Sequence, residues 1–334
     1  MNEPVNLLSV WKLEPEHISR IESVSPRIHF RFAAESQMDS HLADIEVLMT
    51  RNLAVDLKKA PRLKWIQMMG AGADRLDYKI LMERNIRVTN ASGIHAVPIA
   101  EYVFAFMLAF SYRLPVIFAW QGRRHWPKDA RTLLGGSELR GKTILIFGYG
   151  SIGREVGRLA HAFGMRVLAL KHSPDQRDDK GYRLPGLGDP KGEIPERIFG
   201  SSHLLEVLPE CDFVVLTTPL TPETEGMIDE RALRAMKPTA CLINMARGKV
   251  VDEKALIRAL KDKRIAGAGL DVFSQEPLPE DSPLYDLENV IISPHNAGNS
   301  PAYNERLTDV FVENLERYLA GKPLLNLIDL KKKY

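Results

Sequence analysis

The chain has 334 residues, of which 45% are hydrophobic and 26% charged, and its formal net charge is +2. This length favours two domains, and this balance favours a globular protein without nucleic acid or a membrane as partner. No metal-ligand pattern is found either. Cys211 and Cys241 lie in apolar segments and no secretory signal is evident, so we expect free thiols and a cytoplasmic location.

The first part of the chain alternates short apolar segments with polar ones, which predicts strands of a parallel sheet and helices between them. The strands are expected at Val5–Val10, Arg27–Phe32, Ile45–Thr50, Lys64–Met68 and Ile86–Thr89. A long buried helix is expected from Ala96 to Arg113, and an irregular stretch follows from Pro115 to Arg140.

The second part repeats the alternation more clearly. Its strands are expected at Thr143–Phe147, Arg166–Leu170, Phe213–Thr218, Ala240–Asn244, Ile265–Asp271 and Val290–Ile292. A helix is expected at Ile152–Phe163, and Asp229 and Asp252 stand where helix N-caps belong. Residues 173–200, rich in proline, glycine and charge, are expected to form a surface insertion.

The last helix has clear boundaries in the sequence. Ser300 is its expected N-cap, Gly321 ends it, and one face is apolar at Leu307, Val310, Phe311, Leu315, Tyr318 and Leu319. Such a helix can return the chain to the first domain. We therefore predict two doubly wound α/β domains: a flavodoxin-like substrate domain made of residues 1–98 and 299–334, and a Rossmann domain, residues 99–298, inserted in it.

A glycine-rich turn follows the strand at Thr143–Phe147. It has the G-x-G-x-x-G pattern in the required strand–turn–helix context, with the residues Gly148, Tyr149, Gly150, Ser151, Ile152 and Gly153. The first glycine permits the tight turn, the second admits a pyrophosphate to the backbone, and the third lets helix and strand pack closely. The N–H groups at the helix start supply an anion site, so the turn predicts a dinucleotide.

The end of the next strand indicates which dinucleotide is bound. An acidic residue there would accept hydrogen bonds from the ribose diol of NAD, but the chain has Lys171, His172 and Ser173 instead. A lysine would attract the 2′-phosphate of NADP. We therefore expect NAD(P) as cofactor with NADP favoured, while a solvated Lys171 in a pocket that accepts both remains the alternative.

Four side chains suited to one reaction follow the later strands. Arg247 offers a planar fork for a substrate carboxylate, and His295 can cycle a proton near neutral pH. Glu276 would stabilise the imidazolium, and Asp271 would accept from the nicotinamide carboxamide. Because the carboxyl ends of parallel strands share one edge, these groups are expected to converge.

In order and spacing, these segments resemble the D-isomer-specific 2-hydroxyacid dehydrogenases. The resemblance covers most of the chain and rests on the stretches "LRGKTILIFGYGSIGREVGRLAHAFGMRV", "LTTPLTPETEGMID", "CLINMARGKVVDEKALIRAL" and "AGAGLDVFSQEPLPEDSPLYDLENVIISPHNAG". It implies that Arg247 binds the substrate carboxylate, Glu276 tunes the base and His295 is the acid/base.

The resemblance also implies further binding residues and a dimer interface around residues 101–140. The loop Met69, Gly70, Ala71 and Gly72 corresponds to the substrate-carboxylate loop. The cofactor is implied to contact Thr217, Thr218, Pro219, Met245, Ala246, Asp271 and Gly298. His95 departs from the family pattern and is open to two interpretations, a cleft residue or a surface histidine.

The predicted function is hydride transfer between NAD(P)H and a small 2-keto acid, with D-2-hydroxy acid as product and glyoxylate- or hydroxypyruvate-like substrates as the first guess. A formate or phosphite dehydrogenase of the same fold is disfavoured because Glu276 stands where such relatives have glutamine. A dinucleotide-sensing corepressor that keeps the fold is the alternative from another class.

Overall fold

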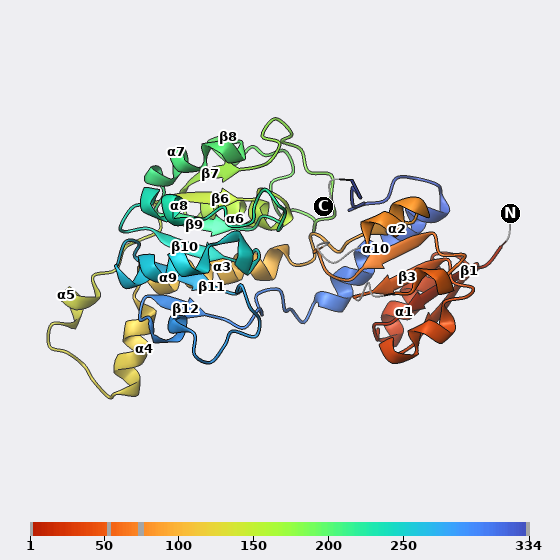
Figure 1. Cartoon of the computed structure of the whole chain (residues 1–334), viewed down its shortest axis with the longest axis horizontal. Coiled ribbons are helices and arrows are strands. Elements are labelled where there is room, and N and C mark those ends of the chain that lie inside the picture. Colours follow the sequence, from red (N-terminus) through yellow and green to blue (C-terminus); the bar gives the residue numbers. More distant parts are fainter. Residues whose placement is uncertain (1–2, 52–54, 73–76, 332–334) are drawn as a thin grey trace. The chain divides into compact units, whose positions relative to one another are not determined.

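The computed structural model describes residues 3–51, 55–72 and 77–331. Internal contacts divide the chain into two compact units, which we call unit 1 (residues 1–94, 180–184 and 300–334) and unit 2 (residues 95–179 and 185–299) (Figure 1). The sequence places the boundaries at residues 98/99 and 298/299, a few residues from those of the structure. It gives no sign that residues 180–184, inside the expected insertion, join unit 1.

Unit 1 is a five-stranded parallel sheet of order β2-β1-β3-β4-β5, the flavodoxin-like order that we expected. The strands are β1 (Val5–Ser9), β2 (Ile28–Phe32), β3 (Val47–Thr50), β4 (Trp65–Met68) and β5 (Arg87–Thr89). Its helical segments are α1 (Pro15–Ser23), η1 (Glu35–His41), η2 (Leu57–Lys59), α2 (Tyr78–Glu83) and α10 (Tyr303–Leu319). The strand order reverses direction between β1 and β3, so this pair is the topological switch point of unit 1.

Helix α10 returns the chain to unit 1, as its apolar face predicts. Phe311 is fully buried and stacks on Trp65 of β4, with 5.3 Å between ring centroids. The helix begins at Tyr303 and not directly after Ser300 as expected, because Ser300 caps the preceding turn: its Oγ accepts the N–H of Ala302 at 3.2 Å.

Unit 2 is a seven-stranded parallel sheet of order β12-β11-β10-β9-β6-β7-β8, a Rossmann arrangement with one added strand. The strands are β6 (Thr143–Phe147), β7 (Arg166–Leu170), β8 (Arg197–Phe199), β9 (Phe213–Leu216), β10 (Cys241–Asn244), β11 (Gly267–Leu270) and β12 (Val290–Ile292). The main helices are α3 (Ala96–Ser111), α4 (Leu114–Gly122), α5 (Ala130–Leu134), α6 (Ser151–Ala162), α7 (Leu204–Val207), α8 (Glu230–Ala235) and α9 (Glu253–Lys261). Short 3₁₀ turns are η3 (Ser201–His203), η4 (Leu208–Glu210), η5 (Gly248–Val250) and η6 (Pro283–Asp286).

Both predicted N-caps in unit 2 are confirmed. Asp229 accepts the N–H of Ala232 at 2.8 Å, and Asp252 accepts that of Ala255 at 3.0 Å. Strand β8 was missed: it lies inside the segment that we expected to be a surface insertion. A three-residue edge strand in a charged segment carries almost no pattern of its own, so only pairing with β7 defines it.

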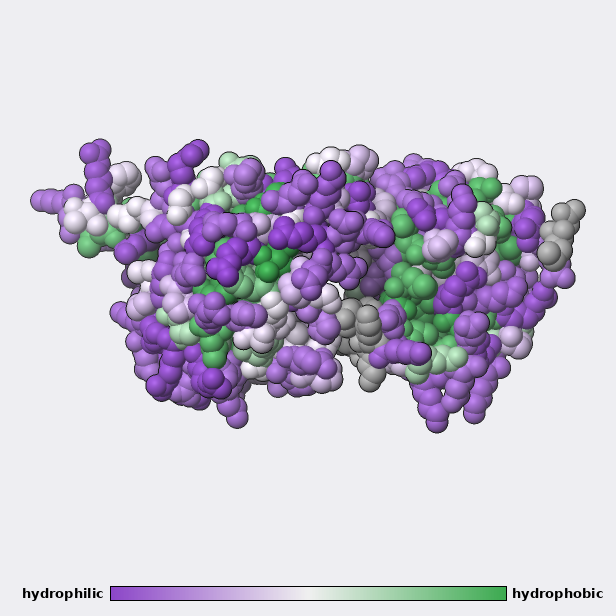
Figure 2. Space-filling model, turned by 90° about the horizontal axis from the view of Figure 1, so that it is seen from above, coloured by the Kyte–Doolittle hydropathy of each residue, from purple (hydrophilic) through white to green (hydrophobic). Residues whose placement is uncertain are grey.

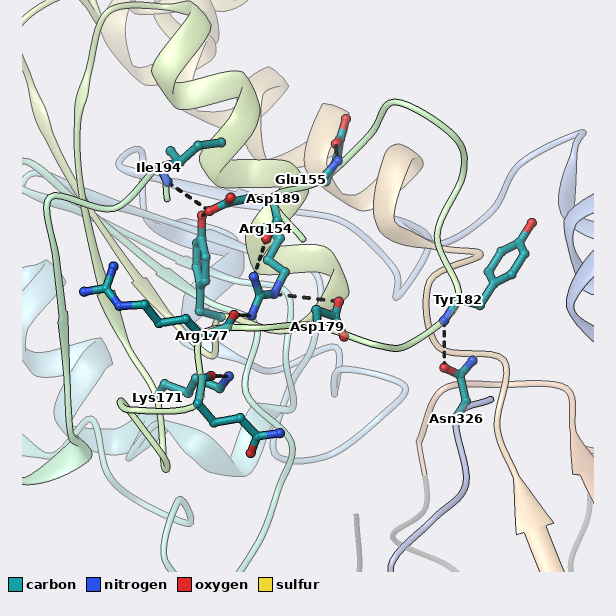
Figure 3. A network of polar contacts seen from close by, with 12 residues as sticks. Arg154, Glu155, Lys171, Arg177, Asp179, Tyr182, Asp189, Ile194 and Asn326 are labelled. Atoms are coloured by element: carbon teal, nitrogen blue, oxygen red, sulfur yellow. Dashed lines mark hydrogen bonds and ion pairs between the residues drawn. The ribbon is translucent and has the colours of Figure 1, made fainter. Parts of the chain in front are cut away.

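The rest of this segment folds against the glycine-turn helix (Figure 3). The buried guanidinium of Arg154, in the first turn of α6, donates to the backbone carbonyls of Asp189 and Arg177. Asp189 accepts from the hydroxyl of Tyr149 at 2.8 Å and from the N–H of Ile194 at 3.1 Å. The segment is therefore a fixed part of unit 2 on both sides of residues 180–184.

Residues 180–184 are attached to unit 1 in the same way. The backbone N–H of Tyr182 donates to Oδ1 of Asn326 at 3.1 Å, and the amide of Asn326 donates to the carbonyl of Ser92 at 2.8 Å (Figure 3). The Tyr182 side chain is buried in the apolar cluster under α10, and a Cβ on Gly93 would lie 2.1 Å from the Tyr182 carbonyl oxygen. Only glycine fits at position 93, so the close approach of the Tyr182 backbone depends on this residue.

Within the described residues, no single helix is long and apolar enough to cross a membrane. Helices α3 and α4 together reach the length and composition of such a span, but they are bent by 70° relative to each other. Helix α3 owes its apolar character to the core of unit 2, where Val103 and Met107 are fully buried.

Candidate active site

The glycine turn at the end of β6 has the backbone that the motif predicts. Gly148 has φ of +102°, and a Cβ there would lie 2.5 Å from the backbone nitrogen of Thr218. A Cβ on Gly153 would lie 2.3 Å from the carbonyl oxygen of Gly148. Around Gly150, in contrast, a Cβ would meet nothing within 4 Å. The two outer glycines are thus required by packing, and the middle one leaves open space beside the start of α6, where an anion can approach.

The side chain of Tyr149 points away from this open space. It is buried against Gly157 of α6 and bonded to Asp189, and burial raises the pKa of its hydroxyl above the ordinary value. Only the backbone of Tyr149, predicted as a cofactor residue, can therefore face a ligand. On the other side of the turn, Thr217 at the end of β9 donates its hydroxyl to the carbonyl of Gly148 at 2.7 Å, which ties the strand end to the turn.

Lys171, His172 and Ser173 follow β7 at the same edge of the sheet. The Lys171 ammonium donates to the carbonyl of Gln176, so it is held over the start of the insertion (Figure 3). Burial, with the charge of Arg154, lowers the pKa of Lys171. Nδ1 of His172 lies 3.2 Å from Oγ of Ser173. The segment after β7 thus presents the ammonium of Lys171 and the polar side chains of His172 and Ser173.

Arg247 follows β10, and its position is fixed by the preceding asparagine. Asn244 is buried, donates its amide to the carbonyl of Arg247 at 3.1 Å and accepts the N–H of Ala246 at 3.0 Å. The guanidinium of Arg247, half-buried, donates to the Ala246 carbonyl at 2.8 Å. Met245 and Ala246 are buried, so these two predicted cofactor residues can contact a ligand mainly through their backbone.

Glu276 and His295 are hydrogen-bonded, with 2.7 Å between Oε2 and Nδ1. The other carboxylate oxygen of Glu276 accepts the N–H of Phe273 at 3.0 Å. Burial would raise the pKa of Glu276, but the bonds from His295 and Phe273 and the charges of His295 and Arg247 outweigh it and lower this pKa. The three predicted catalytic residues therefore form one electrostatic cluster. Glu276 bonds to Nδ1 of His295 and not to the other ring nitrogen, Nε2.

The turn that carries His295 is organised by Asp271 at the end of β11. The buried carboxylate of Asp271 accepts from the hydroxyl of Ser293 and from the N–H groups of Asn296, at 2.8 Å, and Ala297, at 3.1 Å. These bonds hold His295 in a left-handed conformation with φ of +52°. The predicted contact of Asp271 with the nicotinamide stays a prediction, for which Oδ2 retains acceptor capacity beside its bond from Ala297.

His95 supports the same turn from the other end. Its Nδ1 lies 3.1 Å from the carbonyl oxygen of Gly298, and the side chain is half-buried at the start of α3. Of the two interpretations left open by the sequence, a solvated surface histidine does not fit this contact. Through its contact with Gly298, His95 supports the backbone of this turn within unit 2.

Unit 1 carries the predicted substrate loop directly after β4. The N–H of Met69 donates to the carbonyl of Thr50 at 3.1 Å, so it is already used. Asn90 and the N–H of Ala91 hold the carbonyls of Ala71 and Gly70 at 2.9 and 3.0 Å. Among the hydrogen bonds of the described residues, none is donated by the N–H of Gly70, Ala71 or Gly72. The carbonyls are thus fixed and three N–H groups stay available for a carboxylate.

Three residues that shape the site were missed in the sequence: Asn244, Gly248 and Asp189. Asn244 is the last residue of the strand expected at Ala240–Asn244, and a polar residue at the end of an apolar strand is a signal that the sequence contains. Gly248 is required because a Cβ there would lie 1.8 Å from the carbonyl carbon of Phe273, in the segment that carries Glu276. No sequence signal marks the role of Asp189, since its partner Tyr149 lies 40 residues away in the glycine turn.

Comparisons with known proteins agree with this geometry. Residues 104–297 match the family model described as "D-isomer specific 2-hydroxyacid dehydrogenase, NAD binding domain". A glyoxylate reductase of Korarchaeum cryptofilum is 38% identical over 273 residues, which are 81% of this chain and 77% of the relative.

Two solved structures are similar over nearly the whole chain. A D-isomer specific 2-hydroxyacid dehydrogenase family protein of Aeromonas salmonicida has a TM-score of 0.79 at 30% identity, covering 99% of this chain and 100% of that one. A D-isomer specific 2-hydroxyacid dehydrogenase of Xanthobacter autotrophicus, in complex with NADPH and MES, has a TM-score of 0.76 at 27% identity, with 99% and 100% covered.

Proposed function

The chain belongs to the D-isomer-specific 2-hydroxyacid dehydrogenase family, and from this premise we propose how its residues carry out the reaction. It is an NAD(P)-dependent oxidoreductase that transfers hydride between the nicotinamide and the carbon of a 2-keto or 2-hydroxy acid. The corepressor alternative is not favoured. The observation that carries the assignment of roles is the 2.7 Å bond between Glu276 and His295 beside Arg247.

In reduction, the bound nicotinamide supplies the hydride, and the protein must supply a proton and a carboxylate site. His295, hydrogen-bonded to Glu276, donates the proton to the carbonyl oxygen, and in the reverse direction it accepts a proton. Arg247 binds the substrate carboxylate with its planar fork and polarises the carbonyl. Within unit 1, the N–H groups of Gly70, Ala71 and Gly72 are proposed as donors to a carboxylate.

The cofactor is proposed to bind along the glycine turn with its pyrophosphate beside Gly150, Ser151 and Ile152. Thr217, Thr218 and Pro219 line its adenosine side, and Asp271, Gly298 and the backbone of Met245 and Ala246 its nicotinamide side. We propose NADP over NAD, because Lys171 with His172 and Ser173 offers a cation and hydroxyl where a carboxylate would select NAD. Steady-state KM values for NADPH and NADH check this preference, and a lower KM for NADH would contradict it.

Small 2-keto acids such as glyoxylate and hydroxypyruvate are the proposed substrates, supported by the glyoxylate reductase at 38% identity. The test is NADPH oxidation with a panel of 2-keto acids. His295→Gln is expected to lower kcat by about 10²–10⁴-fold, because the positioned proton donor is lost, while NADPH still binds. A panel without any turnover would refute the function, and an active His295→Gln variant would refute the role of His295.

We further propose that the enzyme is a homodimer and that the segment of α4 and α5 is the interface. No residue of α4 or α5 is buried, and Phe118 and Trp126 are 62% and 89% exposed. This segment extends from the rest of unit 2 (Figure 1, yellow), and hydrophobic residues stand among hydrophilic ones at that edge in Figure 2. Large exposed apolar side chains of this kind are typical of contact surfaces.

A further inference from the structure

An arginine stands at the topological switch point of unit 1, where ligands bind in open α/β sheets. Arg51 follows β3 directly, and Trp11 follows the neighbouring strand β1. The guanidinium carbon of Arg51 lies 3.9 Å from the centroid of the Trp11 ring and 5.9 Å from that of Tyr303 in α10. The side chain is thus held by aromatic rings at a ligand-binding edge, although it is exposed to solvent.

The aromatic residues are themselves fixed. Nε1 of Trp11 donates to Oδ1 of Asn304 at 2.9 Å, and the rings of Trp11 and Tyr303 meet edge-on with centroids 5.9 Å apart. Because stacking uses the face of a guanidinium, the N–H donors along its edge stay in the plane. One of them interacts with the Tyr303 hydroxyl, and the others can bond to an anion.

Arg51 differs from other arginines of unit 1 in its ion pairing. Among the described residues, no aspartate or glutamate forms an ion pair with it, whereas Arg20 pairs with Glu305 at 2.6 Å and Arg31 with Asp44 at 2.6 Å in the same unit. A surface arginine without a carboxylate is common, but one pre-oriented by two rings at a switch point has a geometry suited to an anionic ligand.

Tyr303 joins this arginine to the substrate loop. Its hydroxyl donates to the carbonyl of Met69 at 2.8 Å, and Met69 opens the loop whose Gly70, Ala71 and Gly72 N–H groups are available. The guanidinium of Arg51 and the carbonyl of Met69 thus contact the same tyrosine side chain. A short substrate held at the loop by its carboxylate can reach Arg51 with the other end.

We propose that Arg51 is a specificity-determining residue, which makes 2-keto acids with a second anionic group at the end of a short side chain the preferred substrates. A carboxylate, sulfonate or phosphate shares the required chemistry. The inference rests on the proposed reaction and deepens it: glyoxylate and hydroxypyruvate lack the second anion and use the site only in part.

The kinetic test compares kcat/KM for pairs that differ in the terminal anionic group: 2-oxoglutarate with 2-oxopentanoate, 3-sulfopyruvate with 2-oxobutanoate, and phosphohydroxypyruvate with hydroxypyruvate. Wild-type enzyme is expected to prefer the dianion of at least one pair by roughly 10- to 100-fold, the range of a charge-assisted hydrogen bond. Arg51→Met should abolish this preference and leave the monoanion unchanged, and Arg51→Lys should restore part of it.

The control variant is Arg62→Met, since Arg62 is an exposed arginine of the same unit that lies before β4, away from the switch point. It should keep the wild-type preference. The proposal is overturned if no pair favours the dianion in wild-type enzyme, or if Arg51→Met lowers kcat/KM equally for both members of the preferred pair.

A binding measurement separates this inference from the proposed function. N-oxalylglycine and N-ethyloxamate are unreactive mimics of 2-keto acids that differ in one terminal carboxylate. The NADPH-loaded protein should bind N-oxalylglycine at least 10-fold more tightly by calorimetry, and Arg51→Met should remove the difference. If no keto acid is turned over, an Arg51-dependent difference supports the anion site while the reaction fails. Equal binding of the two mimics refutes the site even if monoanions are reduced.

Discussion

At the scale of single residues, the hydrogen bond between Glu276 and His295 depends on pH. The pKa of Glu276 is lowered, so its carboxylate is charged at neutral pH and the pair is present there. As the pH falls through this lowered pKa, Glu276 protonates and the contribution of the pair is lost. The two side chains are 36% and 51% exposed, so salt also weakens the pair.

We therefore expect Glu276→Gln to move the pH profile of keto-acid reduction. Wild-type kcat/KM should fall as the pH drops through the lowered pKa of Glu276, because the protonated carboxyl no longer pairs with His295, and the variant should lack this acid limb. At low pH the variant should approach wild-type activity. A pH series of kcat/KM for both proteins is the measurement. A profile that only drops in height would indicate that Glu276 orients the ring without tuning its charge.

At the scale of elements, the turn η5 depends on a glycine, Gly248, which has no Cβ. The turn η5 that follows Arg247 packs on the backbone of Phe273, and a Cβ on Gly248 would lie 1.8 Å from the Phe273 carbonyl carbon. Gly248→Ala should push away the segment that holds Glu276, lower kcat by at least 10-fold and destabilise the protein by about 1–3 kcal/mol.

Activity assays and thermal unfolding measure both effects. Gly200→Ala is the matched control, because a Cβ at Gly200 would make only ordinary contacts, of 3.9 Å or more. Wild-type kcat in the Gly248→Ala protein would show that the segment from Phe273 to Glu276 tolerates displacement.

The folded insertion is the second feature at the scale of elements. Asp189 is buried and accepts hydrogen bonds from Tyr149, Glu193 and Ile194. Asp189→Ala leaves these donors unsatisfied and should cost about 1–3 kcal/mol of the free energy of unfolding. It should also raise the KM for NADPH, since Tyr149 belongs to the cofactor turn.

Urea unfolding and cofactor titration are the measurements for this insertion. Asp189→Asn, which keeps an acceptor oxygen, should be affected less. A variant Asp189→Ala with wild-type stability would mean that ordered water replaces the carboxylate.

At the scale of the whole molecule, the proposed dimer predicts a change of mass. Phe118→Asp combined with Trp126→Asp places charge on the exposed apolar side chains of the α4–α5 segment and should convert dimer to monomer in analytical ultracentrifugation. Phe32→Asp is the control, since Phe32 of unit 1 is also exposed. A monomeric wild-type protein would refute the proposed interface.

The sequence by itself determined the two parallel sheets, the glycine turn and the position of Arg247, Glu276 and His295 at strand ends, because these follow from local periodicity and from motifs with fixed spacing. The loop from Met69 to Gly72 was expected only from the resemblance to the family, and its role in binding substrate stays a prediction.

Only the tertiary structure decided the rest. Strand β8 exists through pairing with β7, Asp189 meets Tyr149 from a separate segment, and Arg51 is oriented by Trp11 and Tyr303, which lie far from it in the chain. Such contacts depend on which distant segments the fold brings together, and the residues that make them have no periodic pattern.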